Sequence, residues 1–196
     1  MSAREQILMQ IRRQRLPAAA LPELPSEGIC YADRELQFCE VLRSVGGEAI
    51  VAAGASGVRA KIQELPCMQQ ASKILSLVDA AGTGNVDLAT IDDPHQLADV
   101  DVAIAPGEFA VAENGAVWVN GQAVPHRAIL FLTQHLVLVV PRNEIVDHMH
   151  KAYEQLRFEK AGYGVFISGP SKTADIEQSL VIGAHGARSL TVVLVE

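Results

Sequence analysis

Apolar side chains recur every three or four residues in two stretches near the start of the chain, and this spacing predicts two α-helices. In residues 2–15 the pattern begins at Ser2, which forms a capping box with Glu5 three positions later. In residues 33–45 the pattern ends at Gly46-Gly47, a glycine signal typical of a helix C-terminus. The chain is therefore expected to open with one short helix and to enter its main body through a second.

Short apolar runs bounded by turn residues follow the second helix and predict buried strands. They occupy residues 48–52, 73–78, 101–105, 136–140 and 189–195. A helical pattern that starts near Ser56 and stops at Pro66 separates the first two runs. Because strand and helix alternate, the sequence predicts an α/β fold with layers around a mostly parallel sheet.

Two stretches in the second half of the chain carry further local signals. Asn114-Gly115 stands between apolar runs and predicts a tight hairpin turn, because both residues tolerate a positive φ. Asn143 precedes a helical pattern that continues to Leu156 and is expected to cap that helix.

Prolines separate the first helix from the rest of the chain. Pro17, Pro22 and Pro25 lie in an Ala- and Leu-rich stretch that cannot propagate a helix, so residues 17–30 are expected to form an extended connector. The chain then divides into an N-terminal helix with its connector, residues 1–30, and one α/β domain, residues 31–196.

The composition is that of a folded domain with a large core. Of the 196 residues, 49% are apolar and 20% are charged, and the mean hydropathy is +0.18. Intrinsic disorder is excluded, because this much apolar surface offsets the entropy of ordering when it is buried. The net charge of −7 is opposite to the basic surface that nucleic acid binding requires, so no nucleic acid partner is expected.

The charge is distributed unevenly along the chain. Residues 1–16 carry +3, which leaves −10 for the remainder. Residues 74–126 hold eight acidic residues and no Lys or Arg, and this stretch either faces water or raises the pKa of one of its carboxyl groups. The basic first helix can dock on another surface or on a second copy, so a homo-oligomer is among the expected arrangements.

The sequence predicts neither a membrane span nor export. The longest apolar stretch, residues 128–140, is shorter than the ~20 residues that cross a bilayer. Charged residues stand close to the N-terminus, where a signal peptide would be apolar. We therefore expect a cytoplasmic protein.

The cysteines and histidines lack the spacing of metal sites. Cys30, Cys39 and Cys67 are odd in number and far apart, so we expect buried thiols rather than a disulfide framework or a metal clip. The six histidines show no ligand spacing either, and His135 is interpreted as the entry residue of a strand. We expect no metal and no cofactor bound by this chain.

One loop has the chemistry of an anion site. A strand at 165–168 leads into Gly169, Pro170, Ser171, Lys172 and Thr173, and a helix is expected to follow and complete a βαβ crossover. Helix N-terminal amides, hydroxyl groups and a lysine together suit a carboxylate or phosphate. The alternative is an ordinary capped helix, because Asp175 and Glu177 satisfy its positive end without a ligand.

A glycine-flanked turn precedes the last strand. Gly183 and Gly186 surround His185, and Arg188 follows them. Two such glycines let the backbone approach a ligand closely, with His185 and Arg188 as contacts, or they serve only as a helix C-cap.

Five of these segments together resemble the LUD-domain (lactate utilisation) family, of the lactate-utilisation protein C type. They are Asp101-Val-Ala-Ile-Ala, Ala112-Glu-Asn-Gly, His135-Leu-Val-Leu-Val-Val-Pro, Ser168-Gly-Pro-Ser-Lys-Thr-Ala-Asp-Ile-Glu and Gly183-Ala-His-Gly. The resemblance covers nearly the whole chain. It implies a three-layer α/β fold like that of the CoA-transferase and sugar-phosphate-isomerase superfamily. It also implies a role in oxidising L-lactate to pyruvate with iron–sulfur partner proteins, and a ligand site at the C-terminal motif.

The turn at Glu113 departs from the pattern of that family. The usual motif is Ala-Glu-Thr/Ser-Gly, whereas this sequence has Asn114. Ala-Glu-Asn-Gly is also similar to the Ser-Glu-Asn-Gly signature of CoA transferases, in which the Glu is the nucleophile, so Glu113 is the catalytic candidate. However, Ala112 replaces the serine, and no glycine-rich oxyanion loop stands beside it.

Three functions remain open from the sequence. The first is a binding component of a lactate-oxidising system, in which a small organic anion contacts Asn114, Gly115, residues 169–173, His185 and Arg188, with Glu113 as acceptor or base. The second is an acyl-transfer enzyme that uses Glu113 as nucleophile. The third is an interaction subunit that acts through its basic N-terminal helix.

Overall fold

The computed structural model of the chain describes residues 2–14, 19–20, 28–156, 162–174 and 180–196. Its centre is a five-stranded sheet in the order β1-β11-β6-β3-β2, and every neighbouring pair in this sheet is parallel. The strands are β1 (Glu48–Ala52), β2 (Ile74–Ser76), β3 (Val102–Pro106), β6 (His135–Pro141) and β11 (Ser189–Val195). The predicted α/β fold with a mostly parallel sheet is confirmed.

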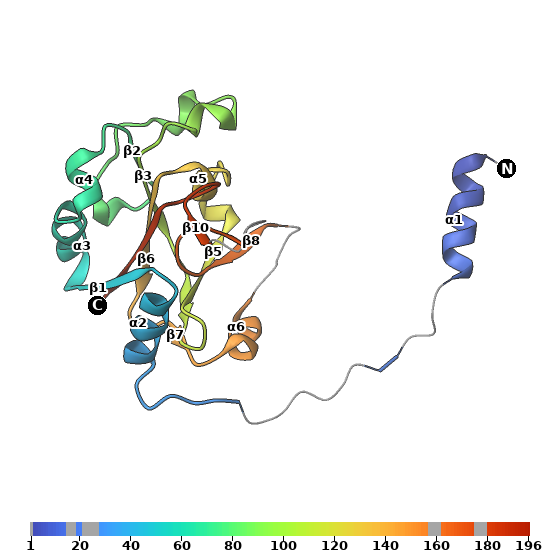
Figure 1. Cartoon of the computed structure of the whole chain (residues 1–196), viewed down its shortest axis with the longest axis horizontal. Coiled ribbons are helices and arrows are strands. Elements are labelled where there is room, and N and C mark those ends of the chain that lie inside the picture. The colour runs from blue at the N-terminus through green and yellow to red at the C-terminus, as the bar shows by residue number, and fades with distance from the viewer. Residues whose placement is uncertain (1, 15–18, 21–27, 157–161, 175–179) are drawn as a thin grey trace.

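Helices cover one face of this sheet. They are α3 (Gly54–Gln63) and α4 (Pro66–Gln70), which lie beside β1 and β2 in Figure 1. Val58 and Ile62 of α3 are buried against Ile104, Val137 and Val193 of the sheet. Strands buried on both faces need no polar alternation, which explains why their sequences are nearly continuous apolar runs.

The opposite face of the parallel sheet is covered by α2 (Arg34–Ser44) and by a second sheet. This sheet has the order β7-β4-β5-β8, with β4 (Phe109–Val111), β5 (Ala116–Asn120), β7 (Ile145–Val146) and β8 (Gly164–Ile167). The antiparallel β4–β5 pair confirms the hairpin predicted at Asn114-Gly115. Gly115 has a φ of +65°, which suits glycine.

The outer face of the second sheet carries an aromatic cluster. The Trp118 and Phe166 ring centroids lie 4.7 Å apart, and Phe109 stacks on Trp118 at 6.4 Å. The short helix α6 (Met149–Gln155) packs there through Ala152, which is fully buried. The described residues of this part of the chain also form α5 (Ile129–Leu132) and 3₁₀ turns at Asp79–Ala81, Leu88–Thr90, Pro94–Leu97 and Gly121–Ala123.

The predicted N-terminal helix is present as α1 (Ala3–Arg13), with both hydrogen bonds of the capping box between Ser2 and Glu5. It stands apart from the rest of the chain in Figure 1, and none of its residues is buried. Most of the predicted connector, residues 17–30, lies outside the described residues. In the described part of the chain, the longest helices have 11 residues, and none is both long and apolar enough to cross a bilayer.

The prediction of a helix after residues 169–173 is wrong for the first turn of that helix. Lys172–Ala174 forms strand β9, which pairs antiparallel with β10 (Leu180–Ile182), so this segment is a hairpin rather than a βαβ crossover. The Gly183 N–H donates to the Ser171 carbonyl (2.8 Å) and closes the open end of the hairpin. Asp175 and Glu177, the predicted residues of the first helical turns, lie outside the described residues.

Two predicted helix starts are also corrected. Asn143 does not cap a helix, because β7 intervenes and α6 begins only at Met149, with the His148 ring as its N-cap acceptor. Likewise α3 begins at Gly54 rather than after Ser56, and its N-cap residue is Ala53. At the first of these places the pairing of β7 with β4 takes up residues 145–146, so the helix starts later than the local capping signal indicates.

Candidate functional site

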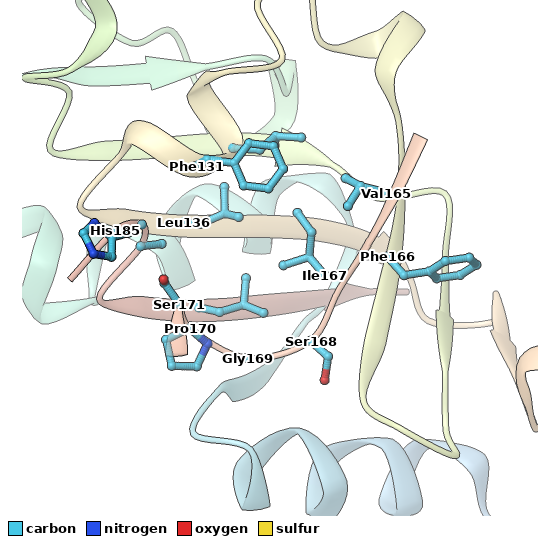
Figure 2. A pocket seen from close by; sticks show the side chains of 14 residues that line it. Phe131, Leu136, Val165, Phe166, Ile167, Ser168, Gly169, Pro170, Ser171 and His185 are labelled. Atoms are coloured by element: carbon cyan, nitrogen blue, oxygen red, sulfur yellow. The ribbon is translucent and has the colours of Figure 1, made fainter. Parts of the chain in front are cut away.

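Part of the predicted ligand loop lines a cavity of about 230 Å³, here called the loop pocket. Figure 2 shows Gly169, Pro170, Ser171 and His185 at one side and Phe131, Leu136 and Ile167 at the other. The cavity lies between the parallel sheet, α5 and β8. Its walls are mostly apolar, and Ser171 and His185 supply side-chain polar groups.

Close packing of backbone fixes the shape of this loop. Gly169 has a φ of +73°, and a Cβ built there would lie 2.5 Å from the carbonyl oxygen of Val45. A Cβ on Gly186 would lie 2.9 Å from the Ser171 Cβ. The glycines of both predicted motifs are therefore required where the two segments approach each other and α2, with or without a ligand.

Glu113 does not line the loop pocket. Its carboxylate accepts a hydrogen bond from the Met149 N–H (2.9 Å), and its own N–H donates to the Asp147 carbonyl (3.0 Å). These contacts join the β4–β5 turn to the N-terminus of α6. The side chain is exposed, and its observed partner gives it a capping role.

Asn114 and Gly115 connect this turn to the loop through backbone. The Ser168 hydroxyl donates to the Asn114 carbonyl (2.7 Å), and the Asn114 side chain accepts from the Ala116 N–H (3.1 Å). Gly115 packs on α2, where a Cβ would lie 2.8 Å from the Leu42 backbone nitrogen. The turn and the loop are neighbours, but residues 113–115 are absent from the pocket wall that the described residues form.

The predicted cations of the site lie in different places. Lys172 and Thr173 are on β9, where Lys172 is exposed, and neither lines the loop pocket. Arg188 instead lines a second cavity of about 200 Å³, here called the edge pocket. The other lining residues are Cys67, Gln70, Ala71, Asp101, Gln134 and His135.

The edge pocket lies where three neighbouring strands begin. Asp101 directly precedes β3, Gln134 precedes β6, and Arg188 precedes β11. Backbone hydrogen bonds hold the three entries in register, from the Arg188 N–H to the Gln134 carbonyl (2.8 Å) and from the His135 N–H to the Asp101 carbonyl (2.8 Å). A larger groove of about 510 Å³ adjoins it and shares Cys67, Gln70 and His135.

Charged and polar groups of the edge pocket influence one another. Burial and then the nearby Arg188 cation lower the pKa of His135, while Asp101 acts in the opposite direction. The His135 Nδ1 lies 2.8 Å from the Ser189 hydroxyl. Backbone N–H groups of Lys73 and Ser72 donate to the Asp101 carboxylate and lower its pKa. Near pH 7 the pocket therefore combines a cation, a carboxylate and a largely neutral imidazole.

Sequence reasoning named Arg188 but missed its neighbours. The sequence predicts His135 as a strand-entry residue and Asp101 as the start of an apolar segment, and it assigns neither of them to a site. The available signal was that polar residues stand directly before three apolar strands, whose amino ends meet if the strands are neighbours in a parallel sheet. The strand order that makes them neighbours comes only from the structure.

The cysteine prediction is wrong for one residue and only partly right for two. Cys30 is exposed, whereas Cys39 and Cys67 are partly buried, and burial raises the pKa of both of those thiols. Across the described residues, no three His, Cys, Asp or Glu side chains gather in an arrangement that could hold a metal ion.

The layered architecture defines the class of the protein as an α/β domain with a parallel core sheet, with a small polar cavity, the edge pocket, where three of its strands begin. A family model described as the LUD domain matches residues 36–195. The chain therefore belongs to the LUD domain family.

Known proteins agree with this assignment. "Lactate utilization protein C" of Geobacillus kaustophilus is 34% identical over 59% of this chain and 48% of its own length. The protein of the same name from Geobacillus thermodenitrificans is 31% identical over 67% of this chain and 53% of its own. The chain thus spans about half the length of these relatives. A crystal structure of a DUF162 family protein from Deinococcus radiodurans shares the fold, with a TM-score of 0.64, 16% identity, and coverage of 86% of this chain and 100% of that one.

Proposed function

We propose that this chain is a component of a lactate-utilisation system and that it binds a small 2-hydroxy acid of the lactate class in the edge pocket. The names of its relatives support the assignment to a lactate-utilisation system, and the residues that line the edge pocket support the binding of a small acid. The observation that carries the proposal is that Arg188, Asp101 and His135 line one small cavity. Its volume of about 200 Å³ is below the ~300–1,000 Å³ of pockets for larger ligands, so it suits a small acid.

Arg188 is the group that would hold the carboxylate. Its guanidinium is always charged, and its fork of N–H donors matches the two oxygens of a carboxylate. No salt bridge of Arg188 occurs among the described residues, so its guanidinium is not held by a protein carboxylate there. Gln134 and Gln70 add amide donors to the same cavity.

Asp101 and His135 would distinguish a hydroxy acid from an oxo acid. A carboxylate accepts hydrogen bonds only, so Asp101 can accept from a 2-hydroxyl group but repels a 2-oxo group. The lowered pKa of Asp101 keeps it charged and an acceptor at neutral pH. We therefore infer that lactate binds more tightly than pyruvate.

We assign the oxidation of lactate itself to partner proteins. Conversion of lactate to pyruvate releases two electrons and two protons, which need a redox acceptor. We propose that iron–sulfur partner proteins supply it and that this chain contributes the bound acid without a cofactor of its own. The three cysteines support this division, because they occupy separate places, with Cys30 exposed, Cys39 on α2 and Cys67 on α4.

Calorimetric titration of the full chain with L-lactate and pyruvate tests the ligand. Arg188→Gln should weaken lactate binding roughly tenfold to a hundredfold, the effect of losing charge-assisted hydrogen bonds. Asp101→Asn should remove most of the preference for lactate over pyruvate, because an amide can also donate. Circular dichroism of each variant checks that the fold is kept.

Lys172→Gln is the matched control, because it removes a cation from the loop that the sequence pattern favours. Its affinity for lactate should equal that of the wild type. If Lys172→Gln weakens binding while Arg188→Gln does not, the ligand lies at the 169–173 loop and the proposal is wrong.

A further inference from the structure

Helix α1 presents an apolar surface that no described residue covers. Ile7 and Ile11 are 57% and 60% exposed, and Leu8 between them is 37% exposed. Residues at positions i, i+1 and i+4 lie on one side of a helix. An isolated helix of 11 residues is marginally stable in water even with a good cap, so α1 gains stability by packing this stripe against a partner.

The charge of α1 indicates what kind of partner it fits. Arg4 and Arg12 border the stripe, Arg13 lies on the opposite side of the helix, and Glu5 already pairs with Ser2 in the capping box. The first 16 residues carry +3 and the remainder of the chain −10. A basic amphipathic helix binds an apolar groove with an acidic rim, and the body of this same chain has the required sign of charge.

One groove of the body has these properties. It measures about 480 Å³ and is lined by Val58, Val78, Ala80, Pro106, Val139 and Val195, and we call it the carboxyl-edge groove. It lies where β3, β6 and β11 end, at the edge of the sheet opposite the edge pocket. The function proposed above does not use it.

The rim of the carboxyl-edge groove is acidic. Glu196 lines it, and the exposed residues Asp79, Glu108 and Glu144 each adjoin a lining residue in the sequence. Two cations, Arg59 and Arg142, also adjoin lining residues, and Arg142 is already paired with Glu35 and Glu196. Arg4 and Arg12 of α1 can therefore find acidic neighbours while Ile7, Leu8 and Ile11 enter the groove.

We propose that α1 of one copy packs into the carboxyl-edge groove of a second copy, and that two copies exchange their helices reciprocally. The connector is anchored on the body at Tyr31, whose N–H donates to Asp147 (2.9 Å). Gln14 and Tyr31 are 17 residues apart in the sequence, and covalent geometry lets a chain of that length reach at most about 60 Å. Helix α1 stands away from the body in Figure 1.

A two-fold arrangement makes both docking events occur together. Each copy donates one helix and one groove, so the contact is self-complementary and closes at a dimer. The second helix docks at the high effective concentration that the first contact creates. The apolar stripe and the apolar groove of each copy are then covered at once.

Sedimentation velocity of the full chain tests the exchange. We expect the wild type to be a dimer and Ile7→Glu/Ile11→Glu to dissociate at least about tenfold more readily. Ala55→Glu, which places a carboxylate in the groove wall at an exposed first-turn position of α3, should have the same effect. Tyr153→Glu on α6, a 63% exposed site away from the groove, is the control and should leave the dimer unchanged.

Mixing the two weakened variants separates docking from misfolding. The helix of Ala55→Glu is intact and the groove of Ile7→Glu/Ile11→Glu is intact, so the mixture should form a heterodimer with one normal contact. A wild type that is monomeric at all concentrations, a dimer that survives both variants, or a mixture that stays monomeric would each overturn the proposal.

Discussion

The imidazole of His135 lies half-buried in the edge pocket, which Arg188 and Asp101 also line, and its protonation is therefore tied to the fold. Burial and the Arg188 cation both favour its neutral form. The pKa is thus lower in the folded state than the ordinary value of 6.5 that applies in the unfolded chain. This difference links the stability of the protein to pH.

The sign of that linkage follows from proton binding. Well above pH 6.5 both states hold His135 neutral, and the group has no effect on stability. As the pH falls below 6.5, the unfolded chain takes up a proton that the folded chain resists, so the free energy of unfolding decreases. Urea denaturation between pH 7.5 and 5 should show this loss, and His135→Gln should make it smaller.

The choice of pH range isolates the histidine. Asp101 has a lowered pKa, so its stabilising effect is lost only as the pH falls below about 4. His185→Gln removes an exposed imidazole and should leave the pH dependence as in the wild type. A pH dependence that is unchanged in His135→Gln would contradict this account of the residue.

Among the elements, the β4–β5 turn is held by its contact with α2, and two glycines allow that contact to be measured. Gly115 has a φ of +65°, and a Cβ there would lie 2.8 Å and 2.9 Å from the backbone N and Cα of Leu42. Gly54 has nearly the same φ, +62°, but a Cβ there would meet nothing within 4 Å. Substitutions at these two glycines therefore separate the cost of backbone strain from the cost of steric overlap.

Alanine at each position gives a clear expectation. Gly54→Ala should cost about 1 kcal/mol, the penalty of the left-handed conformation alone. Gly115→Ala should cost about 3 kcal/mol or more, because backbone atoms of α2 must also move. Both values come from chemical denaturation, and equal losses at the two sites would show that the turn does not pack on α2 as described.

The hairpin of β9 and β10 illustrates the limit of local reasoning at this scale. Ser171 and Thr173 before acidic residues are a helix-capping pattern, yet Lys172–Ala174 is a strand. Its pairing with residues 180–182 and the bond between Gly183 and Ser171 decide the outcome. By contrast, α1 and α2 were predicted correctly because Ser2 and Asp33 cap them within the same segment.

At the scale of the whole molecule, the sequence predicted the parallel core but not the sheet that covers it. The core strands are continuous apolar runs, which the alternation with helices identifies as parallel. The second sheet joins β4 to β7 and β5 to β8, across 35 and more residues, and no local pattern specifies those partners. The same long-range register brings Asp101, His135 and Arg188 together.

The proposed site lies at an unusual edge of the parallel sheet. Open α/β sheets commonly bind ligands beyond the carboxyl ends of their strands, whereas the edge pocket lies at the amino ends. The carboxyl edge instead carries the apolar groove that we assign to α1 of a second copy. On this view, assembly uses one edge of the sheet and ligand binding uses the other.

A crystal structure of the full chain soaked with L-lactate tests the central claim most directly. We predict electron density for lactate in the edge pocket, with its carboxylate on the Arg188 guanidinium and its hydroxyl group on Asp101. Lactate bound beside Ser171 and His185 in the loop pocket, with the edge pocket free of it, would contradict the account.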